Sequence, residues 1–168
     1  DVQAKVTDMV GGVPISEFTA QLAFALSLTF GTGSNTIDKI LINKGADGNG
    51  ITINGGANVD LDVYDLAGFN QGTDPVRNSF TLASIVAVLI TNAGPGPLTV
   101  GNNATGAAWN PFFSGSDTTS VQINPDGFLF FGSRGTPYAV ADSTAHLLRL
   151  AANASAATYK IAILGKSS

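Results

Sequence analysis

Apolar residues alternate with polar or small residues along most of this chain, in short runs that turn residues separate. From Leu22 to Phe30 the large apolar residues occupy every second position, so they share one face of an expected strand. The same alternation returns from Thr158 to Leu164, near the end of the chain. Runs of this length, bounded by clusters of Gly, Pro, Asn and Asp, are typical of an antiparallel sandwich or barrel. The pattern therefore predicts an all-β fold of about nine to eleven strands.

The longest apolar run, Phe80–Thr91, loses strict alternation after Ala83. Such a strand is expected to be covered on both faces, so we predict a central strand whose outer face lies against a neighbouring molecule. Residues Asn124–Gly127 have the sequence NPDG and fit a β-turn with Pro at its second position. We expect this turn to join the flanking runs SVQI and FLFF as a hairpin. Together these features predict an antiparallel, jelly-roll-like β-sandwich.

Residues 1–20 are predicted to form an extended N-terminal arm, and residues 21–168 a single sandwich domain. Gly11, Gly12 and Pro14 interrupt any regular element in the arm, although a short helix capped by Ser16 is an alternative. Apolar residues are costly in an arm that packs on nothing, so we expect it to dock on a neighbouring subunit or a larger assembly. The alternatives are a flexible tail or a strand added to the chain's own sheet. The residues expected to make the docking contacts are Val10, Val13, Ile15 and Phe18.

Charged residues are sparse, at 12% of the chain, against an average of about 25%. The net charge of −4 argues against a nucleic-acid partner, which requires a basic surface, and against an anionic membrane surface. With a mean hydropathy of +0.23, much of the exterior is expected to be covered by partner subunits. The alternative is a β protein with small side chains on its outside.

No arrangement of residues points to catalysis. Asp60 and Asp62 share one face of an expected strand, as glycosidase carboxylates would, but a general acid needs burial to raise its pKa. Charged residues on an exposed edge strand commonly protect against aggregation, and we prefer that interpretation. His146 is the only histidine; the chain lacks a nucleophile-elbow motif, and we expect this residue in a strand at or near an interface. The protein is therefore expected not to be an enzyme and to have no catalytic residues.

No metal site and no organic cofactor are expected. The loop Lys44–Gly50 offers Asp47 and Asn49, but it lacks the further acidic ligands of a calcium loop. Its glycines are followed by neither a phosphate-loop Lys nor an expected helix, and the chain has no cysteine, which excludes thiolate ligands and disulfides. The most apolar early stretch, Leu22–Phe30, is too short to span a membrane, and residues 1–12 lack the pattern of a signal peptide.

Three aromatic residues lie in a segment rich in Gly and Pro rather than in an expected strand. They are Trp109, Phe112 and Phe113. We expect them to plug one end of the sandwich; the alternative is that they contact a partner, because exposed loop aromatics often anchor one.

The order of segments from about Ile85 onward resembles small virion proteins that decorate the heads of tailed bacteriophages. The similar segments are VLITNAG, PLTVG, WNPFF, SVQINPDGFLFFG, TPYAVA and TYKIAILG, together with the earlier ALSLTFGTGSN. The long apolar N-terminal arm of this chain is not part of that pattern.

This resemblance implies a non-enzymatic structural protein of a virion: a capsid decoration, or cement, protein that binds the outside of a phage head as a homo-oligomer and stabilises it. A trimer is expected, with the major capsid protein as the other partner, on the capsid surface after assembly in the host cytoplasm. The alternative is a tail or fibre component that binds a receptor or glycan through its loops.

Overall fold

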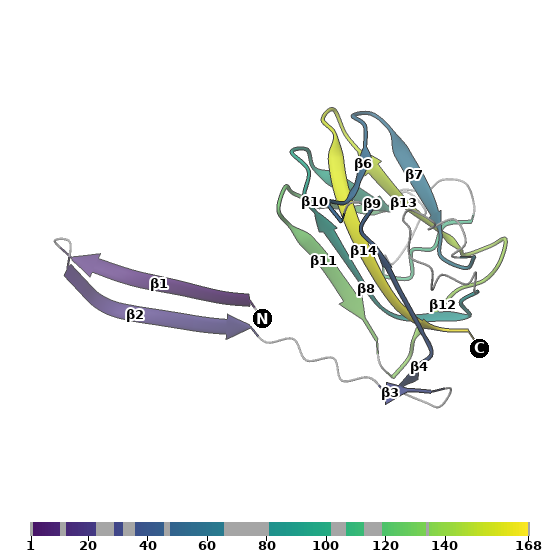
Figure 1. Cartoon of the computed structure of the whole chain (residues 1–168), viewed down its shortest axis with the longest axis horizontal. Helices are drawn as coiled ribbons and strands as arrows, with labels where there is room; N and C mark the ends of the chain where they lie inside the picture. Colours follow the sequence, from purple (N-terminus) through teal and green to yellow (C-terminus); the bar gives the residue numbers. More distant parts are fainter. Residues whose placement is uncertain are drawn as a thin grey trace.

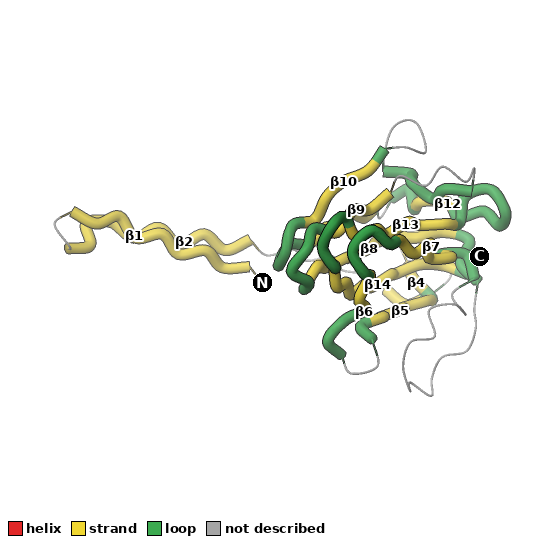
Figure 2. The backbone as a smooth tube through the Cα atoms, turned by 90° about the horizontal axis from the view of Figure 1, so that it is seen from above, coloured by secondary structure: helices red, strands yellow, loops and turns green. Residues whose placement is uncertain are grey.

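The computed structural model describes residues 2–10, 13–22, 29–31, 36–45, 48–65, 81–101, 107–112, 119–133 and 135–167, with side chains from residue 31 onward. Within these ranges every regular element is a strand, and two antiparallel sheets stack as a sandwich (Figures 1 and 2). The prediction of an all-β, sandwich-like fold is confirmed.

The two sheets contain four and six strands. The four-stranded sheet runs in the order β10 (Ser120–Ile123), β9 (Leu98–Gly101), β13 (Leu147–Ala152) and β7 (Asn58–Asp62). The six-stranded sheet runs in the order β11 (Phe128–Gly132), β8 (Ser84–Asn92), β14 (Ala157–Lys166) and β5 (Lys39–Asn43), with β12 (Tyr138–Ala139) paired to β8 and β6 (Ile51–Ile53) paired to β14.

The pairing of these strands is nested along the chain. β5 and β6 pair with the last strand, β14, and β7 pairs with β13. Further inside the sequence, β8 pairs with β11 and β9 pairs with β10. Early and late parts of the chain therefore lie side by side in both sheets, so every layer of the sandwich depends on contacts that are distant in sequence.

The hydrophobic core lies between the two sheets, and strand alternation sets its composition. In β14 every second residue is buried, including Tyr159, Ile161 and Ile163. β8 lies inside the six-stranded sheet, as predicted for a central strand, and contributes Val88 and Ile90 to the core. Each such aliphatic side chain stabilises the fold by about 1.5–3 kcal/mol through its removal from water.

Asn92, a buried polar residue at the end of β8, holds the connection from β8 in one sheet to β9 in the other. Its side-chain amide donates hydrogen bonds to the carbonyl oxygens of Gly96 (2.8 Å) and Ile123 (3.1 Å). Its side-chain oxygen accepts one from the backbone N–H of Gly94 (3.1 Å). These bonds tie the β8–β9 connection to the end of β10, and they satisfy a buried amide that would otherwise be costly.

The N-terminal region differs from the irregular arm that we expected. β1 (Val2–Val10) and β2 (Val13–Leu22) form an antiparallel hairpin, and they pair with no other described strand (Figure 1). Ser16 lies within β2, so the alternative of a helix there is wrong. Gly11 and Gly12 stand between the paired Val10 and Val13, and glycine is favoured in two-residue hairpin connections. The sequence interpretation took these glycines as breakers of structure, when their place in the sequence is that of a hairpin connection.

Two other local expectations have different outcomes. For the strand expected at Leu22–Phe30, β2 ends at Leu22, and β3 (Thr29–Phe30) pairs in parallel with β4 (Thr36–Ile37); residues 23–28 lie outside the described part. The turn at Asn124–Gly127 is present, with the N–H of Gly127 donating to the carbonyl oxygen of Asn124 at 3.0 Å. It does not close a hairpin, because β10 and β11 belong to different sheets. A turn motif specifies a reversal of the chain but not the partner of the strand that follows.

Candidate functional site

The outer face of the six-stranded sheet exposes large apolar side chains. Phe128 is 60% exposed and Ile42 is 57% exposed, at opposite sides of the sheet. Among the residues whose side chains the structure describes, the exposed large apolar ones are Ile40, Ile42, Leu89, Phe128 and Phe130, all on this sheet. We call this surface the outer face. A patch of this kind on a soluble protein commonly marks an interaction site.

Register brings these residues into rows that cross the sheet. In the central row, Phe130 lies opposite Leu89 on β8, and Leu89 lies opposite Ala162 on β14. Ala162 in turn lies opposite Ile42 on β5. Four consecutive strands therefore present an uncharged, apolar row to solvent. Leu89 belongs to the outer face because its neighbours Val88 and Ile90 are both in the core.

A neighbouring row is also apolar, although its residue on β8, Ala87, is buried. Gly132 lies opposite Ala87, Ala87 opposite Leu164, and Leu164 opposite Ile40. On the other side of the central row, Phe128 lies opposite Thr91, which lies opposite Lys160. The charged Lys160 therefore lies beside the apolar rows rather than within them.

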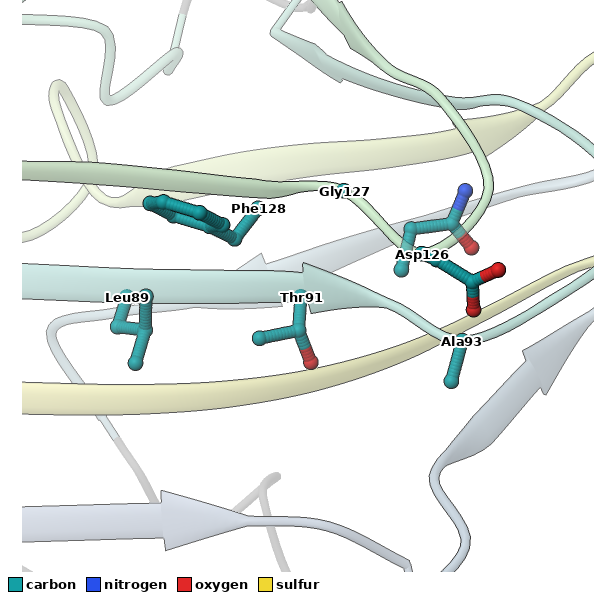
Figure 3. Close-up of a pocket in the computed structure, with 7 residues that line it drawn as sticks. Leu89, Thr91, Ala93, Asp126, Gly127 and Phe128 are labelled. Carbon is teal, nitrogen blue, oxygen red and sulfur yellow. The ribbon is translucent and has the colours of Figure 1, made fainter. Parts of the chain in front are cut away.

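A shallow, open depression of about 430 Å³ lies at one end of the outer face. Figure 3 shows Leu89 and Thr91 on β8 beside Phe128 on β11, with Asp126 in the turn that precedes β11. One carboxylate at the rim of an open, mostly apolar hollow is a poor acid–base constellation, because catalysis requires a second positioned group. The hollow fits an apolar contact better than a reacting substrate.

Trp109 and Phe112, which we call the aromatic plug, pack in and against the core of the sandwich. Trp109 is 1% exposed, and its indole N–H donates to the carbonyl oxygen of Ala139 at 2.9 Å. Three rings lie within 5.7–6.3 Å of the Trp109 ring, those of Phe112, Phe131 and Tyr138. Trp109 therefore belongs to the core and is not available as a surface anchor; Phe112 is partly buried against the same core. Phe113, which we expected beside them, lies outside the described residues.

The carboxylates of β7 are held by the neighbouring strand β13. Arg149 lies opposite Asp60 and binds it through two hydrogen bonds of 2.7 Å each. The hydrogen bonds with Asp60 raise the pKa of Arg149, although its partial removal from water opposes this shift. Bidentate pairing of this kind fixes geometry across two strands. β7 is an edge strand, as predicted.

Asp62 is held in the same region by backbone groups and lies beside a histidine, without a hydrogen bond to its Nδ1. One oxygen of Asp62 accepts hydrogen bonds of 2.9 Å from the backbone N–H groups of Tyr64 and Asp65. The other lies 3.2 Å from Nδ1 of His146, which directly precedes β13. The two carboxylates of β7 thus have separate structural partners.

The four residues predicted to make docking contacts all lie on the hairpin. Val10 and Val13 oppose each other beside the connection, and Phe18 on β2 opposes Val6 on β1. Ile15 falls where the register shifts and has no opposed residue. The structure thus brings these residues into one element, but its register, rather than their order in the sequence, decides which positions share a face.

Candidate metal and membrane features are few in the described part of the chain. Asp47 lies outside it, and the described residues contain no group of three or more His, Cys, Asp or Glu side chains that could hold a metal ion. Nor do those residues include a helix long and apolar enough to cross a membrane.

Comparison with models of known protein families, with curated proteins and with solved structures finds no match for this chain. Its function must therefore be argued from the outer face and the hairpin.

Proposed function

We propose that this chain is a non-enzymatic structural protein of a virion. It assembles as a homo-oligomer, most simply a trimer, and decorates the outside of a tailed-phage head by contact with the major capsid protein. The observation that carries the proposal is the exposed, apolar outer face, which has the character of a surface that is covered in an assembly.

Three further features support this proposal. The pairing of β5 and β6 with β14, β7 with β13, β8 with β11 and β9 with β10 is nested. Nested pairing is compatible with the expected jelly roll, an architecture that is common in capsid proteins. The carboxylates of β7 have structural partners. Finally, the resemblance to head-decoration proteins spans most of the strands that build the sandwich.

The same features disfavour the alternative, a tail or fibre protein that binds a glycan through loop aromatics. Sugar recognition by stacking requires an accessible aromatic face, and Trp109 is buried among other rings. The exposed aromatic residues Phe128 and Phe130 lie on a strand of the sheet instead. A broad apolar surface of this kind fits a protein partner better than a sugar.

Immunogold electron microscopy tests the proposed location. Particles purified from the cells that produce the chain are labelled with an antibody against the sandwich and are imaged in negative stain. Label distributed over the heads is the expected result. Label confined to tails would replace the head assignment with the tail alternative, and particles without label would overturn the virion role.

A further inference from the structure

We propose that the hairpin β1–β2 of one copy docks through its apolar face on the outer face of a second copy. The inference rests on the proposed homo-oligomer and deepens it, because it names the two surfaces that meet. It also replaces the loosely defined docking arm with a specific set of positions.

The register of the hairpin divides its positions into two faces. Opposed positions of an antiparallel pair, and alternate positions along each strand, belong to the same face. One face holds six apolar positions, Val2, Ala4, Val6, Phe18, Ala20 and Leu22, and ends at the opposed polar pair Asp8 and Ser16, beside the register shift. The other face holds six positions that are all polar or charged: Gln3, Lys5, Thr7, Glu17, Thr19 and Gln21. The hairpin is therefore amphipathic over most of its length.

An amphipathic hairpin of two strands needs a surface to cover its apolar face. Isolated two-stranded hairpins are marginally stable in water, and further strands or an element packed on their apolar positions are needed for stability. β1 and β2 pair with each other and with no other described strand, and the hairpin lies away from both sheets of its own chain (Figure 1). The chain thus carries an apolar donor face and, on the sandwich, an apolar acceptor face.

The two faces match in length and in chemistry. β1 and β2 contain 9 and 10 residues, and the central strands of the outer face, β8 and β14, also contain 9 and 10. At about 3.3 Å per residue, each of these strands is about 30 Å long. The central row of the outer face carries no charge, and the six apolar positions of the hairpin face carry none, with Asp8 at the end of that face near the connection. Two such faces can stack at about 10 Å, the usual spacing of packed sheets.

The area of contact favours exchange between copies. A hairpin about 30 Å long and about 10 Å wide covers about 300 Å², so each dock removes about 600 Å² from water when both surfaces are counted. In a pair of copies that exchange hairpins, the single interface contains two docks and buries about 1,200 Å², the lower limit for stable, specific interfaces. In a ring of three, each interface contains one dock and buries about 600 Å², so a trimer needs further contacts besides the hairpin. Docking on the chain's own sheet would bury the hairpin without holding copies together.

Cross-linking between single-cysteine variants tests the contact, because the chain has no cysteine of its own. Phe18→Cys and Leu89→Cys are co-expressed on full-length chains with tags of different size, and are treated with a bis-maleimide that reaches about 10 Å, the spacing of packed sheets. A product that joins the two tagged chains is expected, at least tenfold more abundant than in the control. The control pairs Phe18→Cys with Ser120→Cys, at an exposed position on the edge strand β10 of the other sheet.

The outcomes separate this inference from the proposed function. If the double variant F18C/L89C cross-links only within one chain, the hairpin docks on its own sheet and the inference is overturned. Absence of any Phe18–Leu89 product overturns it as well, and a native mass above that of one chain would then leave the homo-oligomer standing with another interface. Cross-linking between chains that accompanies unlabelled virions would keep the interface and remove the virion role.

Discussion

Asp38 and Ser167 join the start of the six-stranded sheet to the end of the chain. The backbone N–H of Ser167 donates to one carboxylate oxygen of Asp38 at 2.9 Å, and the Ser167 hydroxyl donates to the other. Partial burial alone would raise the pKa of Asp38, but these hydrogen bonds and the nearby charge of Lys39 outweigh it and hold the pKa below its usual value. The last residues of the chain are thereby fastened beside β5.

This contact predicts a loss of stability in acid. A depressed carboxylate pKa adds stability above the unfolded value of about 3.9, and this stability is lost as the pH falls through the lower, folded pKa. We expect Asp38→Ala to reduce the free energy of unfolding by about 1–2 kcal/mol at pH 7. Urea denaturation from pH 7 to pH 2 should show this difference shrink below about pH 4. An equal loss in Asp142→Ala, at an exposed carboxylate, would show that the contact is not responsible.

Tyr159 predicts a loss of stability at high pH. Burial in the core raises the pKa of Tyr159 to about 12, whereas an unfolded tyrosine ionises near 10. The folded state therefore retains a proton that the unfolded state loses, so stability is complete below about pH 10 and declines as the pH rises towards 12. We expect Tyr159→Phe to reduce this decline, measured by urea denaturation between pH 8 and pH 11. A slope identical to that of the unchanged protein would contradict the assignment.

The sequence predicted elements well where one local pattern was sufficient. Alternation in Thr158–Leu164 predicted the inner and outer faces of β14, and the doubly apolar run predicted that β8 is central. Which strands pair with one another could not be predicted from local patterns. NPDG fits a turn within a hairpin and a turn between two sheets equally well. The assignment of β10 and β11 to different sheets depends on their pairing with β9 and β8, which are distant along the chain.

The candidate site illustrates the same limit. Leu89 could be identified as apolar from the sequence, but its place in a row with Phe130, Ala162 and Ile42 follows from the register of three strand pairs. For the hairpin, the signal was present but was misinterpreted. Two consecutive glycines flanked by valines match a hairpin connection. The two faces were not accessible in this way, because the register shifts between Asp8 and Met9 and pairing outward from Val10 and Val13 would have put Lys5 opposite Phe18.

The aromatic plug predicts a sharp contrast between two large side chains. Trp109 is buried and surrounded by rings, whereas Phe128 is exposed. Trp109→Ala should destabilise the fold by about 3–5 kcal/mol, and Phe128→Ala should change stability by less than about 1 kcal/mol. Thermal and urea unfolding of both variants, at a concentration where the native masses agree, measures the contrast. Similar losses for both residues would mean that the outer face is already covered within one chain.

The outer face itself predicts a variant that keeps the fold but does not assemble. Leu89→Asp places a charge in the middle of the apolar row, where docking would remove it from water without a partner, so assembly should weaken by at least tenfold, about 1.4 kcal/mol. In a single chain Leu89 is 38% exposed, and the charge would remain solvated, so the melting temperature of the monomer should change little. Ser120→Asp, on the other sheet, is the matched control and should assemble normally.

Light scattering at micromolar concentration measures the mass of each variant. A monomeric mass for the unchanged protein would contradict self-assembly, unless assembly requires the capsid surface, in which case the same pair of variants is compared for binding to particles. Equal assembly of both variants would place the interface elsewhere on the sandwich.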